Sequence, residues 1–426
     1  MQKNYHESFK YRKIKRPNKV VAFAVMRAFN IISKKRGAIF TYTDEFNKYK
    51  NKQMVLVSSH PSRDDYIYVL GGFKRTDVHA VCGYQNIFQK SSYPLLKRLG
   101  VIAKYLYQPD VISVKQILQV VKEGRSLYFA PEGMQSTSGS TNPINPATIN
   151  LLFKLKLPVA IATLHGSYFT KTRYSRDLKK GKISVNFDML FTEKDFQNYS
   201  KEELEKKLLD RLKYNDYEYN AQNKIKFVGK YPNIHGLDNI IYKCPKCNRE
   251  FNFEIDKDTM TCRDCGFSVS MNEYYELSSA NGLPFADVDA WFKWQRQEIR
   301  KEIKNPDFVL STPTELFTVN TAKLDNNYSQ LKLGDGEIKL TREGLYYNGT
   351  KNGENVSLFF EAKSVYSLSI SLDYELYFYY KHDYYSFKPT KDKKQVVKWM
   401  LASEEVHNLY DESWAKARRE VYQYED

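Results

Sequence analysis

Long hydrophobic runs are missing from this chain of 426 residues. A membrane-spanning helix needs about 18 or more consecutive apolar residues, whereas the longest run near the N-terminus, from Val20 to Met26, is followed at once by Arg27. The basic N-terminus is not followed by a small-residue cleavage site. The sequence therefore predicts neither a secretory signal nor a membrane span, and we expect a cytoplasmic protein.

Cysteine is scarce, with five residues in the whole chain. Four of them form two C-x-x-C pairs, Cys244 with Cys247 and Cys262 with Cys265, whereas Cys82 stands alone. Such pairs in a large non-secreted chain are typical of metal ligation and not of a disulfide framework. Both pairs resemble the knuckles of a zinc ribbon. Because four thiolates close a tetrahedral site, we expect structural zinc with no open position for catalysis.

An excess of negative charge is also absent, because 66 Lys and Arg outnumber 50 Asp and Glu and give a net charge of +16. Most of the excess lies in residues 1–36, which hold eleven bases and one acid. Residues 308–426 hold fifteen bases and eighteen acids, a net charge of −3. A basic N-terminal segment favours an anionic partner, either lipid headgroups or nucleic acid.

The N-terminal segment divides into two parts. Residues 1–16 predict a flexible basic arm. Residues 17–35 predict a helix with apolar side chains framed by Lys19, Arg27 and Lys34. This pattern is typical of a helix that lies in the membrane interface, and it fits equally an ordinary helix packed on its own domain.

The composition, 42% hydrophobic and 27% charged, excludes a disordered or fibrous chain, and the length suggests about two to four domains. Apolar runs that alternate with helix-like segments predict a layered α/β domain with a mostly parallel sheet. The β-rich C-terminal part ends in a helical segment, a layout that resembles pleckstrin-homology-like domains. The expected order is a basic arm and amphipathic helix (1–36), the α/β domain (37–235), the four-cysteine zinc ribbon (236–280), a linking helix (281–306), and a β domain closed by a helix (307–426).

A histidine and two carboxylates directly follow the predicted strand Met54–Ser58, in the stretch Ser-His-Pro-Ser-Arg-Asp-Asp. The carboxyl ends of parallel strands open onto the crevice in which α/β proteins bind ligands. His60 is therefore a candidate general base, oriented by a neighbouring acid. Asp65, five residues on, and Asp64, four residues on, both remain candidates for that acid.

A second strand-end motif, Phe-Ala-Pro-Glu-Gly-Met-Gln-Ser over 129–136, adds to the first. Together the two motifs resemble the glycerolipid acyltransferase superfamily of the lysophosphatidic acid (1-acylglycerol-3-phosphate) type, whose hallmarks are His-x4-Asp and a later Phe-Pro-Glu-Gly-Thr-Arg-Ser. His60 and Asp65 match the first hallmark. Leu-Pro-Val at 157–159 resembles a later family segment. The matches to the second hallmark are Pro131, Glu132, Gly133 and Ser136.

The resemblance implies roles for these residues. His60 deprotonates the acceptor hydroxyl, and Asp65 raises the basicity of His60. The acyl donor is an acyl-CoA or acyl-carrier-protein thioester. The segment implied to seat the acceptor contains Pro131, Glu132, Gly133, Gln135 and Ser136.

Two positions at which the family carries arginine hold Gln135 and Leu106 here. Arginine forks match phosphate geometry, whereas glutamine cannot neutralise a dianion. Lys104, Arg63 and Arg173 are the candidates to supply the missing charge if the acceptor is lysophosphatidic acid. Otherwise the acceptor is a less charged lipid, such as another lysophospholipid or a glycolipid.

The sequence thus predicts a membrane-peripheral O-acyltransferase of phospholipid biosynthesis, on the inner face of the cell membrane. Its partners would be an anionic membrane surface, a lysolipid acceptor and the acyl donor. The alternative from another class is a zinc-ribbon nucleic-acid-binding protein with an inert α/β domain, which the ribbon and the basic arm favour. Because no interleaving of aromatic and basic residues typical of an RNA-binding motif is found, we expect no nucleic acid partner.

Overall fold

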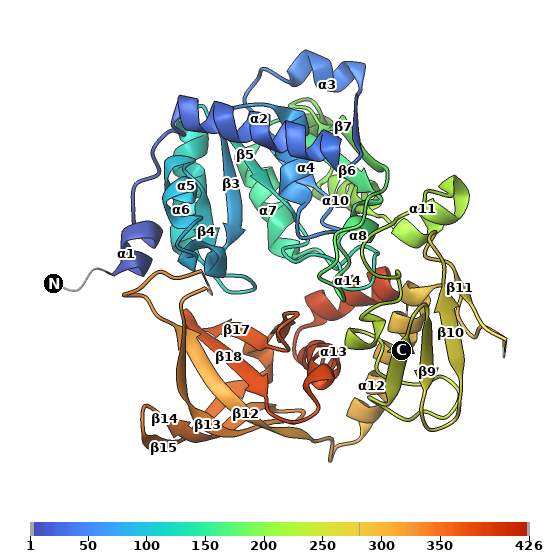
Figure 1. The fold of residues 1–426 in the computed structure, drawn as a ribbon. Coiled ribbons are helices and arrows are strands. Elements are labelled where there is room, and N and C mark those ends of the chain that lie inside the picture. Colours follow the sequence, from blue (N-terminus) through green and yellow to red (C-terminus); the bar gives the residue numbers. More distant parts are fainter. Residues whose placement is uncertain (1–3, 281, 327, 424–426) are drawn as a thin grey trace.

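The computed structural model describes residues 4–280, 282–326 and 328–423. Residues 1–3 and 424–426, at the ends of the first and last expected domains, lie outside the described residues, as does residue 281, the expected start of the linking helix. Three sheets follow one another along the chain. Figure 1 shows the first and the third sheet in two halves of the molecule, with the second, in yellow, beside them. The exact domain boundaries stay a prediction.

A seven-stranded sheet in the order β1-β7-β6-β2-β5-β3-β4 forms the N-terminal half. Neighbouring strands are parallel except β6 and β7, so the expected mostly parallel sheet is confirmed. Val55, Leu56 and Val57 of the central strand β2 are fully buried, as in strands covered on both faces. The strands are β1 (Ala38–Tyr42), β2 (Val55–Ser58), β3 (Val78–Gly83), β4 (Ile102–Lys104), β5 (Ser126–Phe129), β6 (Val159–His165) and β7 (Ile183–Phe191).

Helices cover both faces of this sheet, and each face has its own hydrophobic cluster. The helix α10 begins at a capping box, in which the Ser200 hydroxyl and the Glu203 carboxylate each accept the other residue's amide. Among the described residues, no helix has both the length and the hydropathy needed to cross a bilayer. The helices are α3 (Asp44–Tyr49), α4 (Asp65–Phe73), α5 (Tyr93–Arg98), α6 (Val111–Lys122), α7 (Pro146–Leu155), α8 (Ser167–Thr170), α9 (Asp195–Asn198), α10 (Lys201–Leu212) and α11 (Asp216–Asn223).

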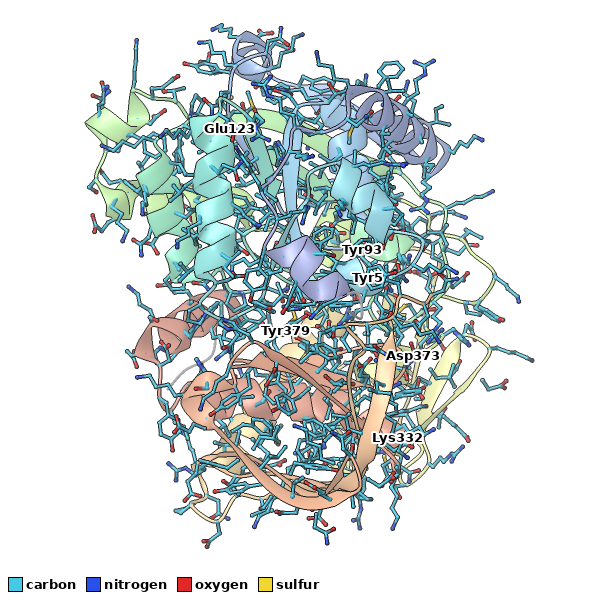
Figure 2. All side chains as sticks on the ribbon, turned by 90° about the vertical axis from the view of Figure 1, so that its left-hand side faces the viewer. Tyr5, Tyr93, Glu123, Lys332, Asp373 and Tyr379 are labelled. Carbon is cyan, nitrogen blue, oxygen red and sulfur yellow. The ribbon has the colours of Figure 1, made fainter. Side chains whose placement is uncertain are left out.

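Residues 4–16 do not form the free arm expected from the sequence. Helix α1 (Tyr5–Lys10) packs on the α/β half, where Figure 2 shows Tyr5 beside Tyr93, with ring centroids 5.4 Å apart. The Lys10 ammonium is buried 2.5 Å from the Asp110 carboxylate. A buried charge is tolerated only when it is paired, so this ion pair ties the arm to the domain and removes one base from contact with lipids.

Helix α2 (Lys19–Lys35) has one packed and one exposed face. The packed face lies on α4 at close range, because a Cβ at Gly71 would come within 2.8 Å of the Phe29 carbonyl carbon. Its buried side chains are Ala22, Met26 and Ser33. Residues three or four apart share a helix face, and the exposed stripe consists of Lys19, Val20, Phe23, Ala24, Arg27, Ala28, Ile31, Lys34 and Lys35. One face of α2 therefore packs on its own domain, as the sequence allowed. Membrane binding by the exposed face stays a prediction.

The cysteine segment forms a small antiparallel sheet in the order β11-β10-β9-β8. Helix α12 follows it within the expected linking segment, and begins after its capping residue Asp287. The Trp291 ring of α12 packs against Phe253 and Phe267, at centroid distances of 5.9 Å and 6.1 Å, so the segment and the helix share a core. The elements are β8 (Phe253–Asp256), β9 (Thr259–Cys262), β10 (Ser268–Met271), β11 (Leu277–Ser278) and α12 (Val288–Lys304).

A second seven-stranded sheet, entirely antiparallel, forms the C-terminal β domain, in the order β15-β14-β13-β12-β18-β17-β16. Strand β12 pairs with both β13 and β18 and so joins the first four strands to the last three. The likeness to pleckstrin-homology-like domains remains one of layout. The strands are β12 (Leu310–Val319), β13 (Gln330–Leu340), β14 (Gly344–Lys351), β15 (Glu354–Glu361), β16 (Ser369–Ile370), β17 (Leu376–Tyr380) and β18 (Asp383–Pro389).

Two helices, α13 (Val396–His407) and α14 (Glu412–Tyr422), follow the last strand, where the sequence predicts one. The Asp411 side chain caps α14 and so separates it from α13. The buried Arg296 guanidinium of α12 lies 2.6 Å from the Glu404 carboxylate of α13. This pair connects the β domain to the cysteine segment through α12.

Candidate active site and metal centre

His60 and Asp65 meet at the carboxyl end of the central strand β2. The chain turns through Pro61 and Ser62 and enters α4, which brings the His60 Nδ1 atom 3.1 Å from the Asp65 Oδ2 atom. In the neutral tautomer that this contact favours, Nδ1 donates to the carboxylate and Nε2 is the ring nitrogen that could take up a proton. The His60 side chain is 24% exposed and that of Asp65 is fully buried. The pair therefore has the form of a base with an orienting acid.

Three donors surround the Asp65 carboxylate. Besides His60, the Ser62 amide donates at 2.7 Å and the Ser167 hydroxyl at 2.8 Å. Burial raises the pKa of Asp65, and these hydrogen bonds act in the opposite direction. Asp65 also occupies the first turn of α4, where the helix dipole favours a negative charge. The carboxylate is therefore fixed in one orientation toward His60.

Asp64, the other candidate orienter, binds two bases instead. Its carboxylate lies 2.7 Å from the Arg36 guanidinium and 3.1 Å from the Lys171 ammonium. The geometry therefore favours Asp65 over Asp64 as the acid that orients His60.

Glu132 has a different environment from the one implied by the resemblance. Its side chain is buried and faces the main chain, with Oε1 accepting the His60 amide at 2.7 Å and Oε2 the Asn142 amide at 2.9 Å. Burial raises the pKa of Glu132 to about 7. Both oxygens are engaged inside the protein, so Glu132 positions the His60 backbone and offers no contact to an acceptor.

Ser136 is turned inward as well. Its amide donates to the His60 carbonyl at 2.9 Å and its hydroxyl to the Ser140 carbonyl at 2.6 Å. Three other residues of the expected seat vary in exposure: Pro131 is buried, Gln135 half-buried and Gly133 exposed, with φ +74°. Among the residues predicted to bind the acceptor, only Gly133 and Gln135 therefore keep surface that a ligand could contact. The others support the loops that follow β2 and β5.

Arg63 and Arg173 lie at the boundary between the α/β half and the C-terminal β domain. The Arg63 guanidinium donates to the Tyr328 hydroxyl, and that of Arg173 to the Ile370 carbonyl. Burial lowers the pKa of Arg173, and the nearby charge of Arg63 lowers it further. Within 4–280, 282–326 and 328–423, neither arginine forms an ion pair with a carboxylate. Both guanidinium groups therefore donate to neutral oxygens of the β domain.

Lys104 belongs to another cluster. Its ammonium donates to the Tyr105 carbonyl at 3.1 Å and interacts with the charges of Lys10 and Asp110. Burial lowers the pKa of Lys104. Leu106, at the family's arginine position, lines a cavity of about 10 Å³ against the β domain, room for about one water. Of the three candidate cations, Lys104 is thus separated from the other two.

The C-terminal β domain covers the loops that carry these residues. The Tyr107 ring stacks on Tyr366 with centroids 3.8 Å apart, and the Ser369 hydroxyl donates to the Met134 sulfur at 3.0 Å. Figure 2 shows Tyr379 between the two halves of the molecule. The candidate site therefore lies at the boundary of the two halves, and both contribute residues to it.

Sequence reasoning missed Ser167 and Asn142, which hold Asp65 and Glu132. Ser167 follows the end of β6 by two residues, so the strand-end argument that singled out His60 could have found it. No comparable signal marks Asn142, because its contribution is a backbone amide.

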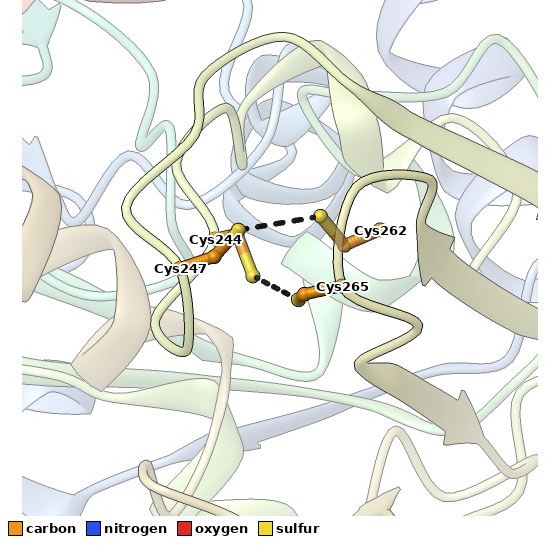
Figure 3. A group of neighbouring side chains, drawn as sticks. All are labelled: Cys244, Cys247, Cys262 and Cys265. Carbon is orange, nitrogen blue, oxygen red and sulfur yellow. Dashed lines mark hydrogen bonds between the residues drawn. The ribbon is translucent and has the colours of Figure 1, made fainter.

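The four paired cysteines converge on one point (Figure 3). Their Sγ atoms all lie within 4.8 Å of one another, and Cys244 to Cys265 and Cys247 to Cys262 are each 3.7 Å apart. Four ligands at about 2.3 Å from zinc in a tetrahedron are about 3.8 Å from each other. A disulfide needs about 2.05 Å. The four thiols could therefore hold zinc, as the sequence predicts.

We expect one zinc ion per chain by elemental analysis and its loss in Cys244→Ser. Structural zinc contributes on the order of 10 kcal/mol to a small domain. Chelation should therefore lower the thermal unfolding midpoint and shift the fluorescence of Trp291, which packs on this segment. Cys82→Ser is the matched control, because Cys82 lies outside the cluster. A metal-free purified protein that unfolds at the same temperature with and without chelator would contradict the zinc assignment.

Comparison with known proteins gives one informative match. No family model matches the chain. The 1-acyl-sn-glycerol-3-phosphate acyltransferase of Cocos nucifera is 23% identical over 152 residues, which cover 34% of this chain and 48% of that enzyme. The chain thus spans about half the length of this curated relative.

A solved structure aligns with part of the chain. The crystal structure of the 1-acyl-sn-glycerophosphate (LPA) acyltransferase PlsC from Thermotoga maritima covers 47% of this chain and 88% of its own, at 15% identity and a TM-score of 0.35. The sequence similarity to the coconut enzyme supports, at a coarse level, a relation to the acyltransferase superfamily that the two motifs resemble.

Proposed function

We propose that this protein is a membrane-peripheral O-acyltransferase, which moves a fatty acyl group from a thioester donor to the hydroxyl of a lysophospholipid. The observation that carries the proposal is the 3.1 Å contact between His60 Nδ1 and the buried Asp65 carboxylate at the end of β2. The similarity to a 1-acyl-sn-glycerol-3-phosphate acyltransferase supports the same class of reaction. Acyl-CoA and acyl carrier protein are the donors that suit it.

In the proposed reaction, His60 Nε2 takes the proton of the acceptor hydroxyl while the hydroxyl oxygen attacks the thioester carbonyl carbon. The carbon–sulfur bond then breaks, and the departing thiolate takes the proton from His60. Asp65 stabilises the imidazolium formed in between. Glu132 and Ser136 hold the His60 main chain and so preorganise the base. A zinc site closed by its four cysteine ligands would act as a structural brace.

The neighbouring Arg63 and Arg173 support a phosphate-bearing acceptor, with lysophosphatidic acid first. Two guanidinium groups provide the forked donors that phosphate oxygens accept. Gln135 and Leu106, which are neutral, favour the alternative of a less charged lipid or glycolipid acceptor.

The exposed stripe of α2 supports attachment to an anionic membrane surface, which we propose to be the inner face of the cell membrane. This stripe combines apolar side chains with bases and contains no acid. Each base near an anionic surface contributes about 1 kcal/mol, and an apolar helix face adds to it.

We expect His60→Ala to lower kcat by about 10²- to 10⁴-fold, because a general base is lost. Asp65→Asn should lower kcat by nearly the same factor. Asp64→Asn is the matched control and should lose far less, since Asp64 binds Arg36 and Lys171. Initial rates of acyl transfer measure kcat for each variant, and thermal unfolding verifies that each variant is folded. An active His60→Ala enzyme would refute the proposed mechanism, and a crippled Asp64→Asn beside an active Asp65→Asn would reverse the orienter assignment.

We expect Arg63→Ala and Arg173→Ala to raise KM for lysophosphatidic acid by about 10- to 100-fold, because charge-assisted hydrogen bonds to phosphate are lost. The KM for an uncharged monoacylglycerol should change little. Lys104→Ala is the control, because it removes a cation that interacts with Lys10 and Asp110. A panel of lysolipid acceptors with each thioester donor measures these constants. Equal rates with and without the acceptor phosphate would select the less charged acceptor.

Deletion of residues 1–35 would not test membrane binding alone. It would also destabilise the fold, because Phe9, Ile14 and Met26 are part of the core. Substitutions confined to the exposed face of α2 avoid this problem.

We expect Phe23→Ser with Ile31→Ser to weaken binding to anionic vesicles by about 10- to 100-fold, since two apolar side chains would no longer enter the bilayer interface. These side chains are 62% and 47% exposed. Val309→Ser with Leu331→Ser removes similarly exposed apolar groups from the β domain and serves as the control. Vesicle sedimentation measures both, and equal sedimentation of the two doubles would contradict binding through α2.

A further inference from the structure

A shallow groove of about 610 Å³, open to solvent, lies where α2 ends, at the edge of the first sheet. One wall is formed by residues 34–39, at the end of α2 and the start of β1, and the other by residues 180–182, just before β7. The two walls meet because β1 and β7 pair in parallel, with Ala38 opposite Ile183. This site is separate from the loops that carry His60 and Glu132.

Two glycines set how closely the walls approach. Gly37 adopts φ +92°, and a Cβ there would lie 2.2 Å from the Gly181 carbonyl oxygen. A Cβ at Gly181 would lie 2.2 Å from the Phe227 ring. Neither position accepts a side chain, so the close approach of the two basic segments depends on glycine at both.

Five bases line this groove, and no acid is among its lining residues: Lys34, Lys35, Arg36, Lys180 and Lys182. Arg36 is paired with Asp64. In the described part of the chain, no carboxylate forms an ion pair with any of the four lysines. Favourable contact with the α2 dipole accounts for Lys34 and Lys35, but not for Lys180 and Lys182. Such a concentration of one charge attracts anions.

Apolar side chains surround the basic groove. Ile39 lines it and is 50% exposed, and Leu178 and Val228 nearby are 42% and 51% exposed. Val228 is placed there by backbone hydrogen bonds of 2.8 Å and 3.0 Å with Lys180. With the exposed stripe of α2 on the other side, the groove has the combination of bases and apolar groups that suits the headgroup level of a bilayer.

We propose that this groove binds the phosphate of an anionic membrane lipid headgroup. The inference rests on the membrane attachment proposed above and gives it a specific site, which shares Lys34 and Lys35 with the exposed stripe of α2 and adds Lys180 and Lys182. The ligand is a phosphodiester with its acyl chains attached, because the apolar rim would contact the acyl region while the lysines contact the phosphate. Free phosphate would leave that rim in water.

One side chain links the groove to the pair of His60 and Asp65, here called the dyad. The Arg36 guanidinium, on the groove wall, lies 2.7 Å from the Asp64 carboxylate, which precedes Asp65 at the start of α4. A headgroup held in the groove would therefore attach the bilayer to the same short segment that carries the orienting acid.

The test is vesicle sedimentation of Lys180→Gln with Lys182→Gln, with the α2 stripe left intact. The loss of two bases should weaken binding to vesicles of phosphatidylglycerol and phosphatidylcholine by about 30-fold and change binding to pure phosphatidylcholine little. The matched control is Lys339→Gln with Lys363→Gln, which removes two exposed lysines from the β domain, the half of the molecule opposite α2 in Figure 1. This control should weaken vesicle binding by less than about threefold. Thermal unfolding verifies that both doubles fold.

Three results would overturn the headgroup site: unchanged binding of Lys180→Gln with Lys182→Gln, an equal loss in the control, or displacement of wild-type protein from vesicles by inorganic phosphate at constant ionic strength. The last would indicate a site for free phosphate. These outcomes are independent of catalysis, because His60→Ala tests transfer with the groove intact. If the lysine substitutions leave vesicle binding unchanged and His60→Ala abolishes acyl transfer, the headgroup site is refuted and the proposed function is retained. If His60→Ala remains active, the proposed function is refuted and the result says nothing about the headgroup site.

Discussion

The hydrogen bond from the His60 amide to the Glu132 carboxylate, 2.7 Å long, is the interaction on which the candidate site depends. It joins the loop after β2 to the loop after β5, and Asn142 supplies the donor for the second oxygen. A carboxylate buried without donors is costly, so Glu132 holds both loops in a single arrangement. Glu132 is 1% exposed, and this burial raises its pKa to about 7.

A second buried carboxylate supports the dyad from the other side. Asp216 accepts the Gly166 and Tyr168 amides at 3.0 Å and 3.1 Å, and burial raises its pKa to about 7. These bonds hold α8, whose first residue, Ser167, donates to Asp65. The orientation of the base is thus fixed through a series of buried acids, each satisfied by the main chain or hydroxyl of the next loop. Chemistry at the exposed edge of His60 would then need little reorganisation.

The two halves of the molecule contribute different parts of the proposed site. The α/β half carries the dyad, the exposed stripe of α2 and the basic groove. The β domain covers the strand ends and contacts both arginines through Tyr328 and Ile370. Its connection through α12 to the cysteine segment, by the Arg296 and Glu404 pair, gives that cover a rigid support. The acceptor site would therefore depend on both halves.

Local sequence was enough to predict the mostly parallel sheet, the convergence of the four cysteines, and the pairing of His60 with a nearby acid, because these follow from local periodicity and short spacing. Tertiary structure decided the rest. It placed Asp65, and not Asp64, against His60, and it turned Glu132 inward. It gave Lys104 and Arg63 different partners, and it buried Lys10 within an arm that the sequence predicts to be free. In each case the deciding partner is distant along the chain, and desolvation of a charge depends on what packs over it, which no local pattern contains.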